Sequence, residues 1–549
     1  MKKKITLFAG SLIFSASLLV AQPTIDDPFF TKVSYIGAMQ DYDWTEGWCN
    51  WNCQYTNYPA ATVEVKDTIV GSVTWTNDKV YLLKGFVYVV DGATLTIQEG
   101  TIIRGDKTTM GSLIVERGGK VFARGTKEKP IVMTSNQPAG LRAWSDWGGL
   151  VICGKAKINK GEEQIEGGPR SKYGGNDDDD NSGVYQYIRI EFPGYPFQPD
   201  KEINGLTLGA VGRGTTIDHI FVAYSGDDSF EFFGGTVNCK YLVSYRGQDD
   251  DFDTDYGYSG MVQFGIALRD PQKADKSGSN GFESDNDGSG TTTEPITKAI
   301  FSNISVYGPR YNDTVMTSFD ANFGRGHHIR RNSSLSSMNN IICGWPTGLF
   351  VDGFRSRRNW DTTKTLHIQY DILAGMIKNF EVNNDSTTSG FNWAKYVSVW
   401  NDASNHNLPL ASSVNYPALV DPFNIAQPDF RLKPSSPARN KSYWAVKGDT
   451  VAEPKPVVVG LKKYIGNELS LSAYPNPAQG ECNIHISVST AGVLSVKVYD
   501  ITGMEVADLF NQKVVAGDYK VLFVAPKSGM FFVKAYLNGS MQVIKVIAQ

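Results

Sequence analysis

The chain has 549 residues, which is more than one compact hydrophobic core usually holds, so we expect at least two structural units. Its 55 glycines and 12% aromatic residues favour many short strands joined by turns over helices. The formal net charge is −4 and the sequence has no basic stripe. This charge pattern excludes a nucleic-acid-binding protein, so we predict no nucleic-acid partner.

The N-terminus has the pattern of a signal peptide, which we predict over residues 1–21. Three lysines follow Met1, residues 5–20 are apolar, and Ala21 precedes the expected cleavage point. No later segment is apolar enough to cross a bilayer, so we expect no transmembrane segment after removal of the signal. The sequence therefore predicts a protein that is exported through the periplasm.

Residues 22–60 are aromatic and irregular, with three tryptophans close together at Trp44, Trp48 and Trp51. A solenoid needs its open end covered, so we predict that this segment is an N-terminal aromatic cap. The alternative is an exposed aromatic platform that binds sugar rings.

The cysteines are interpreted in light of export, which makes disulfides chemically possible. Cys49 and Cys53 are close enough in sequence to bridge if their loop is tight, and we expect a disulfide between them. Cys153, Cys239 and Cys343 each lie singly in an apolar strand, so we expect buried thiols there.

Residues 61–445 repeat one pattern, a short strand of alternating apolar and polar residues that ends at glycine. Residues 84–97, 187–194, 219–226 and 303–308 are examples. Such strands are too short to form a core alone, but they can stack in register as a parallel β-helix. This rhythm and the ending Asp429–Ala438 resemble right-handed parallel β-helix proteins of the pectate-lyase-like superfamily. The resemblance implies binding or cleavage of acidic polysaccharides.

The composition changes after Tyr443, and we predict a proline-punctuated linker at residues 446–466 and a separate unit at 467–549. Alternating strands with turns between them predict a small β-sandwich, so the predicted fold class is all-β. The unit contains Tyr-Pro-Asn-Pro at 474–477 and Tyr-Asp-Ile-Thr-Gly at 499–503. These motifs resemble the C-terminal sorting domain of the type IX secretion system of Bacteroidetes. The resemblance implies the type IX machinery as a partner and a location that is secreted or on the outer cell surface.

Acidic bursts recur within the β-helix at residues 225–231, 247–253 and 279–285. If each burst lies on one coil, the carboxylates stack on one face, where repulsion favours a bound cation. Residues 283–294 also resemble an EF-hand calcium loop, although the first position is Glu and no helices flank it. We predict calcium as the metal, with these candidate ligands: Asp227, Asp228, Asp249, Asp250, Asp251, Asp253, Asp255, Glu283, Asp285, Asp287 and Glu294.

The function favoured by the sequence is binding of a glycan or another surface ligand by a calcium-stabilised β-helix. The rival is a polysaccharide lyase or glycoside hydrolase on the acidic face, because paired carboxylates and neighbouring basic residues suit either chemistry. The basic candidates are Arg246, Arg269, Lys273, Arg325, His327 and Arg330, and no single residue among them is identified as a catalytic base. A structural component of the cell surface is the third alternative.

Overall fold

The computed structural model describes residues 24–198, 201–383, 390–452, 469–488, 490–501, 503–538 and 540–549. The chain divides into two compact units, residues 1–453 and 454–549, each described by itself. The predicted signal peptide and residues 453–466 of the predicted linker lie outside the described residues. No described helix is long and apolar enough to span a membrane.

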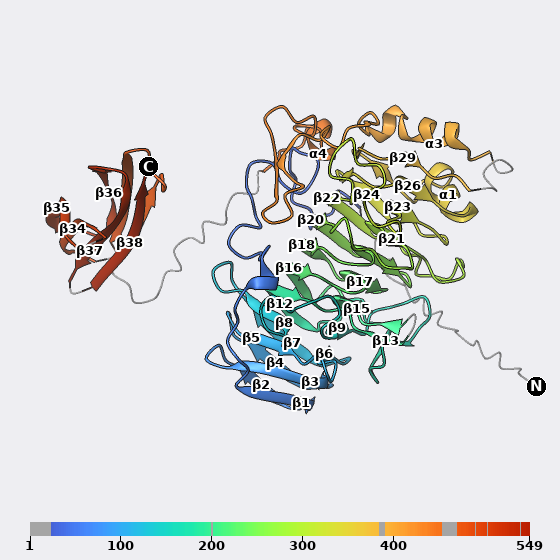
Figure 1. Ribbon diagram of the computed structural model, residues 1–549, viewed down its shortest axis with the longest axis horizontal. Helices are drawn as coiled ribbons and strands as arrows, with labels where there is room; N and C mark the ends of the chain where they lie inside the picture. Colours follow the sequence, from blue (N-terminus) through green and yellow to red (C-terminus); the bar gives the residue numbers. More distant parts are fainter. Residues whose placement is uncertain are drawn as a thin grey trace, which may run out of the picture. The chain divides into compact units, whose positions relative to one another are not determined.

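The first unit is a parallel β-helix in which successive coils stack from β1 to β29 (Figure 1). Strand register separates three parallel sheets. Sheet 1 contains β2 (Ser72–Trp75), β4 (Thr94–Ile97), β7 (Lys120–Arg124), the first halves of β12 (Gly183–Glu191), β16 (Thr216–Ala223), β18 (Cys239–Tyr245), β20 (Met261–Leu268) and β22 (Ile300–Tyr307), then β24 (Ser336–Met338) and β27 (Ile368–Gln369).

Sheet 2 contains the first halves of β1 (Val63–Ile69) and β3 (Val80–Val89), β5 (Ile102–Gly105), β8 (Ile131–Ser135), the second halves of β12, β16, β18, β20 and β22, then β25 (Ile341–Cys343) and β28 (Ile372–Ala374). Sheet 3 contains the second halves of β1 and β3, β6 (Ser112–Val115), β9 (Gly149–Cys153), β15 (Leu206–Gly209), β17 (Phe230–Phe233), β19 (Phe252–Asp255), β21 (Phe282–Ser284), β23 (Arg325–Ile329), β26 (Thr347–Val351) and β29 (Lys378–Phe380).

The core is filled by like residues stacked from coil to coil. Phe230, Phe252 and Phe282 stack inside sheet 3 with ring centroids 5.5 and 5.3 Å apart, and His327 continues the stack 4.4 Å from Phe282. Burial lowers the pKa of His327 to about 3, so this histidine is a neutral core side chain. The predicted strand rhythm therefore produces the solenoid core.

The bend between sheets 1 and 2 is a left-handed residue that recurs in successive coils, first inside one long strand and, in the last two coils, between two short strands. The residues with positive φ at this bend are Tyr187, His219, Tyr241, Phe264, Asn303, Asn339 and Tyr370. Their side chains form a ladder along the outside, with His219 stacked 4.1 Å from Tyr187 and 4.2 Å from Tyr241.

The N-terminal segment covers this ladder along the side of the β-helix, so its predicted place over the open end is wrong. Gly37 of this segment donates a backbone hydrogen bond to Asn339 in a late coil. Cys53 of the same segment accepts, through its carbonyl, a hydrogen bond from Arg142, which follows β8 in an earlier coil. Trp44 and Trp48 are 3% and 0% exposed, so they are packing residues, not a sugar platform. The segment packs along the side because the bend residues, many of them aromatic, project outward and form a surface that it can bury.

The end near β29 is covered by helices. In α3 (Trp393–Trp400), Tyr396 and Trp400 pack on Phe380 of β29, with ring centroids 5.3 and 6.2 Å away. The remaining elements of this unit are short: η1 (Cys53–Tyr55), β10 (Glu163–Gln164), β11 (Lys172–Tyr173), β13 (Pro196–Gln198), β14 (Lys201–Glu202), α1 (Phe354–Asp361), η2 (Ala403–Asn405), β30 (Leu419–Asp421), β31 (Asp429–Leu432) and α4 (Tyr443–Lys447).

Two smaller expectations differ from the structure. All six cysteines are free thiols, so the disulfide between Cys49 and Cys53 is not present, while Cys153, Cys239 and Cys343 are buried as expected. Residues 446–452, assigned to the linker from their composition, belong to the first unit. The Ala452 backbone N–H donates to the Lys32 carbonyl, which ties this segment to the N-terminal one.

The second unit is an antiparallel β-sandwich with its own core. One sheet contains β32 (Leu469–Tyr474), β33 (Glu481–Val488) and β36 (Gly517–Val524). The other contains β34 (Gly492–Asp500), β35 (Glu505–Val514), β37 (Gly529–Leu537) and β38 (Ser540–Ala548). The predicted all-β class, a parallel β-helix followed by a small sandwich, is confirmed.

Candidate cation site

The outward face of sheet 3 carries a continuous row of polar side chains. Register places Thr207, Glu231, Asp253, Glu283 and His328 beside one another in β15, β17, β19, β21 and β23. Because side chains alternate across a strand, the residues on either side of each point toward the core. The repeat spacing in the sequence therefore becomes a straight line of functional groups.

Earlier coils of the same face are covered by the insertion at residues 154–182, between β9 and β12. Ile114 and Val151, which continue the row toward β6, are buried with Ile158 and Tyr173 of the insertion in an apolar cluster separate from the main core. The polar part of the row therefore begins where this apolar cover ends.

The turns that enter sheet 3 are joined by side-chain hydrogen bonds between coils. Asp228 Oδ1 accepts from the Asp250 backbone N–H at 2.8 Å, and Asp250 Oδ1 accepts from the Asn280 N–H at 2.5 Å. Asn280 Oδ1 accepts from the Arg325 N–H at 3.0 Å. These bonds fix two carboxyl groups beside the row and leave one oxygen of each for another partner.

Seven acidic residues form what we call the acidic cluster: Asp227, Asp228, Glu231, Asp249, Asp250, Asp253 and Glu283. They make three overlapping groups, each with three oxygens within 4.8 Å of one another. The first two groups share Asp228 and the last two share Asp253, so the three groups form a chain along the coils. Clustered carboxylate oxygens are the donor set that calcium prefers.

The electrostatics of the cluster oppose ionisation of all its members. Burial and repulsion between neighbouring carboxylates raise the pKa values of Asp228, Glu231, Asp250 and Asp253 well above the ordinary range. Within the described part of the chain, none of these four forms an ion pair with a lysine, arginine or histidine. Asp253 Oδ1 is buried without a hydrogen-bond partner. A bound cation would satisfy this oxygen and remove the repulsion.

Two further carboxyl groups have pKa values raised close to neutrality. Burial raises the pKa of Asp249 to about 7. Burial and then repulsion from Asp285 raise the pKa of Asp255 to about 8. Their ionisation therefore changes near neutral pH.

The end of the row at Glu283 is basic. Arg330 pairs with Glu283 and lies 2.8 Å from an oxygen of Asp285, which also pairs with Arg331 at 2.7 Å. Burial alone would raise the pKa of Glu283, but His328, 3.2 Å away, and Arg330 lower it below its usual value. The row therefore changes from uncompensated carboxylates to ion-paired ones between β19 and β21.

Two neutral oxygens beside Glu231 were not predicted. The side chain of Asn204 donates to Glu231, while Asn204 Oδ1 and Thr207 Oγ1 have no hydrogen-bond partner. Both residues are buried, at 3% and 2% exposed. No acidic burst marks either position. The register of β15 with β17 places Thr207 beside Glu231, and Asn204 reaches Glu231 from the segment before β15.

Several predicted ligands lie outside the acidic cluster. Asp251 was expected to converge with Asp253, but it precedes the strand and forms a fully buried pair with Arg269 at 2.8 Å. Asp287 accepts bonds from Ser289 and Thr291 in its own turn, and exposed Glu294 accepts from the Ile296 N–H. Asp255 and Asp285 belong to none of the three groups of clustered oxygens. Of the carboxylates in the EF-hand-like segment 283–294, only that of Glu283 is in a group, so this spacing does not gather the carboxylates at one site.

Residues 67–408 match the pectate-lyase like β-helix domain. The chain belongs to the pectate-lyase-like β-helix family. Residues 472–549 of this β-helix protein match the secretion system C-terminal sorting domain. The sorting domain shows handling by the type IX secretion system and export to the cell surface or release from the cell, as predicted.

The comparisons with solved structures and with curated proteins give no information about function. The enzymatically active domain of bacteriophage CBA120 tailspike protein 2 aligns at 12% identity and a TM-score of 0.22, over 86% of this chain and 66% of that one. Tailspike protein 4 of the same phage aligns at 10% identity and 0.21, over 85% and 63%. At such low TM-scores the alignments say nothing about function. No curated protein matches the sequence.

Proposed function

We propose that this exported β-helix protein binds calcium in the acidic cluster and captures an anionic glycan through the bound calcium. The observation that carries the proposal is the set of four carboxyl groups that lack a basic partner: Asp228, Glu231 and Asp250, which are buried, and the partly buried Asp253. Calcium accepts six to eight oxygens in flexible geometry. The unpartnered oxygens of Asn204 and Thr207 add neutral donors next to Glu231.

The glycan part of the proposal follows from exposure and charge. Asp253 and Glu283 are only partly buried on the outward face, so an ion held there reaches solvent. An ion with fewer protein ligands than it accepts can also bind uronate carboxylates or hydroxyls. A carboxylate-rich face alone would repel an acidic polymer, so binding of such a polymer requires the cation.

The second candidate is a polysaccharide lyase or glycosidase at the same face. The observation that favours it is the basic end, where buried His328 Nε2 has no hydrogen-bond partner and lies 3.8 Å from Asp352. A basic side chain beside a cation site suits proton abstraction from a uronate.

Chelation tests the calcium part of the proposal. Excess EDTA should lower the melting temperature of the β-helix unit, and added calcium should restore it, because the cation removes repulsion among buried carboxylates. The Asp253→Asn variant should melt higher than the unaltered chain in EDTA and gain little from calcium. The control Asp91→Asn changes a carboxylate on an exposed turn and should respond to calcium like the unaltered chain. Equal melting temperatures with and without calcium would contradict the proposal.

A second assay separates glycan binding from catalysis. Polygalacturonate and alginate are incubated with the protein, with and without calcium, and retention on the immobilised polymer is measured. Calcium-dependent retention without new reducing ends or ultraviolet absorbance of unsaturated uronates supports capture. Release of unsaturated products that is lost in His328→Gln would establish the lyase instead. Calcium binding with no retention of either polymer would contradict glycan capture and favour a structural component of the cell surface.

A further inference from the structure

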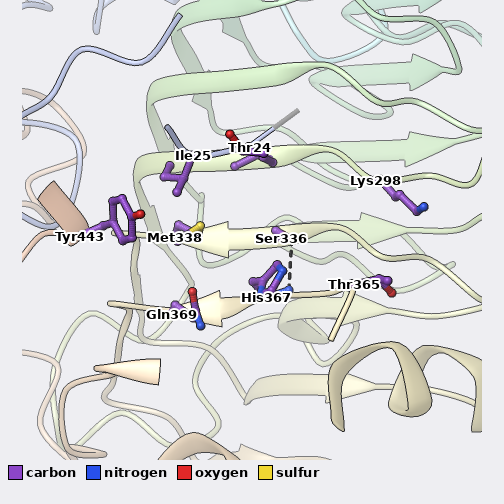
Figure 2. Close-up of a pocket in the computed structure, with 10 residues that line it drawn as sticks. Thr24, Ile25, Lys298, Ser336, Met338, Thr365, His367, Gln369 and Tyr443 are labelled. Atoms are coloured by element: carbon purple, nitrogen blue, oxygen red, sulfur yellow. Dashed lines mark hydrogen bonds between the residues drawn. The ribbon is translucent and has the colours of Figure 1, made fainter. Parts of the chain in front are cut away.

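A second candidate site lies on sheet 1, on a different face from the acidic cluster. It is a pocket of about 360 Å³, within the range of small-ligand sites. Ile300, Ser336 and His367 come from successive coils, and Thr24, Ile25 and Tyr443 come from distant parts of the chain. Figure 2 shows the ten lining residues, which also include Lys298, Met338, Thr365 and Gln369.

The two ends of the pocket differ in chemistry. Ile25, Met338 and the ring of Tyr443 lie at one end, and Lys298 and Thr365 lie at the other, with His367 between them (Figure 2). None of the ten lining residues is acidic. Burial, with a smaller contribution from Lys364, lowers the pKa of His367, so its imidazole is neutral near pH 7. Lys298 therefore supplies the positive charge of the lining.

Most of the other polar groups in the lining already have partners. The hydroxyl of Tyr443 donates to Asp26 at 3.0 Å, and the amide of Gln369 donates to Asn405 at 3.2 Å. Ser336 Oγ accepts the His367 backbone N–H at 3.1 Å, the bond drawn in Figure 2. A sugar needs many available donors and acceptors, and this lining offers few.

We propose that the pocket binds a small amphipathic monocarboxylate, with its carboxylate at Lys298 and its apolar body against Ile25, Ile300 and Met338. An ammonium–carboxylate contact fixes the head, because no acidic side chain of the lining competes for Lys298. The apolar side chains and the Tyr443 ring bury the tail, which supplies affinity in proportion to the area removed from water.

Titration calorimetry of the full-length chain with decanoate, below its micelle concentration, tests the inference. The matched neutral probe is decan-1-ol, which has the same tail without the charge. Saturable one-to-one binding of decanoate is expected, with decan-1-ol about tenfold weaker because a hydrogen bond to a charged group is lost. Decan-1-ol that binds as tightly as decanoate, or decanoate that does not bind saturably, would overturn the proposal.

Variants locate the binding. Lys298→Met should weaken decanoate about tenfold and leave decan-1-ol unchanged, while Ile300→Thr should weaken both because it removes apolar wall. Lys433→Met, a change at an exposed lysine outside the pocket, is the control and should bind like the unaltered chain. Melting curves establish that each variant is folded. If both pocket variants bind decanoate like the control, the ligand lies elsewhere and the proposal fails.

Discussion

Asp228 and Asp250 each serve the fold and the cluster with different oxygens. Oδ1 of each accepts the backbone N–H of the next coil, which holds the stacked turns in register. Both residues also belong to the groups of clustered oxygens, where burial and repulsion raise their pKa values. In the described chain Asp253 accepts no such backbone hydrogen bond, so its unpartnered oxygen is the stronger indication of a bound ligand.

The raised pKa values predict how stability depends on pH when no calcium is present. A carboxyl whose pKa is higher in the folded than in the unfolded state retains its proton better when folded. The stability that these carboxyl groups contribute is therefore greatest below about pH 4, the unfolded value, and is lost as pH rises through the folded pKa. The values of about 7 for Asp249 and about 8 for Asp255 place this loss between about pH 4 and pH 8.

Urea unfolding in EDTA measures this dependence. Each raised pKa unit corresponds to ~1.4 kcal/mol of differential stability. The fall should be smaller in Asp249→Asn and should largely disappear in excess calcium, which competes with protons for the same oxygens. A stability that rises across this pH window in EDTA would contradict the burial-driven shifts.

At the scale of elements, the N-terminal segment and the bend ladder depend on each other. Repeated left-handed residues inside the long strands place large side chains outside the solenoid, where they need cover. Trp48 packs edge-on against Tyr187 and His219, with ring centroids 5.6 and 5.4 Å away. The segment thereby buries an aromatic strip that the coils alone would leave in water.

Replacing Trp48 by alanine should lower the free energy of unfolding of the β-helix unit by about 3–5 kcal/mol, the usual cost of truncating a fully buried tryptophan. Trp393→Ala is the matched control, because that side chain is 45% exposed and should cost far less. Urea unfolding followed by tryptophan fluorescence measures both changes. Equal effects of the two substitutions would show that burial of the segment does not stabilise the coils.

At the scale of the molecule, the two units have separate hydrophobic cores. The acidic cluster and the sheet 1 pocket both lie within the first unit. The sorting unit carries the information for export, and the β-helix carries the candidate sites. Neither site draws a residue from the sorting unit.

Deleting residues 454–549 should therefore leave the melting temperature and calcium response of the β-helix unit unchanged, because its core and candidate ligands remain. Calorimetry of the full and shortened chains provides the comparison. Loss of the β-helix transition or of its calcium response in the shortened chain would mean that the sorting unit contributes to that fold.

The sequence by itself determined the fold class, the export route and the coils that carry the acidic bursts. Short alternating strands with regular turns have few ways to bury their apolar faces, so the rhythm predicts the β-helix. It also identified six of the seven members of the acidic cluster as ligand candidates, and Glu231 stood in the first burst.

Only the tertiary structure decided which oxygens face one another. Asp251 and Asp253 are alternate residues, yet a turn before β19 sends Asp251 to Arg269 and Asp253 to the outward row. Thr207 joins the row through β15, and Asn204 reaches it from the segment before β15; no local pattern marks either position. The pairing of segments that are distant in the sequence sets these contacts, and it also sets the place of the N-terminal segment and the pocket on sheet 1. The spacing of residues along the sequence does not specify this pairing.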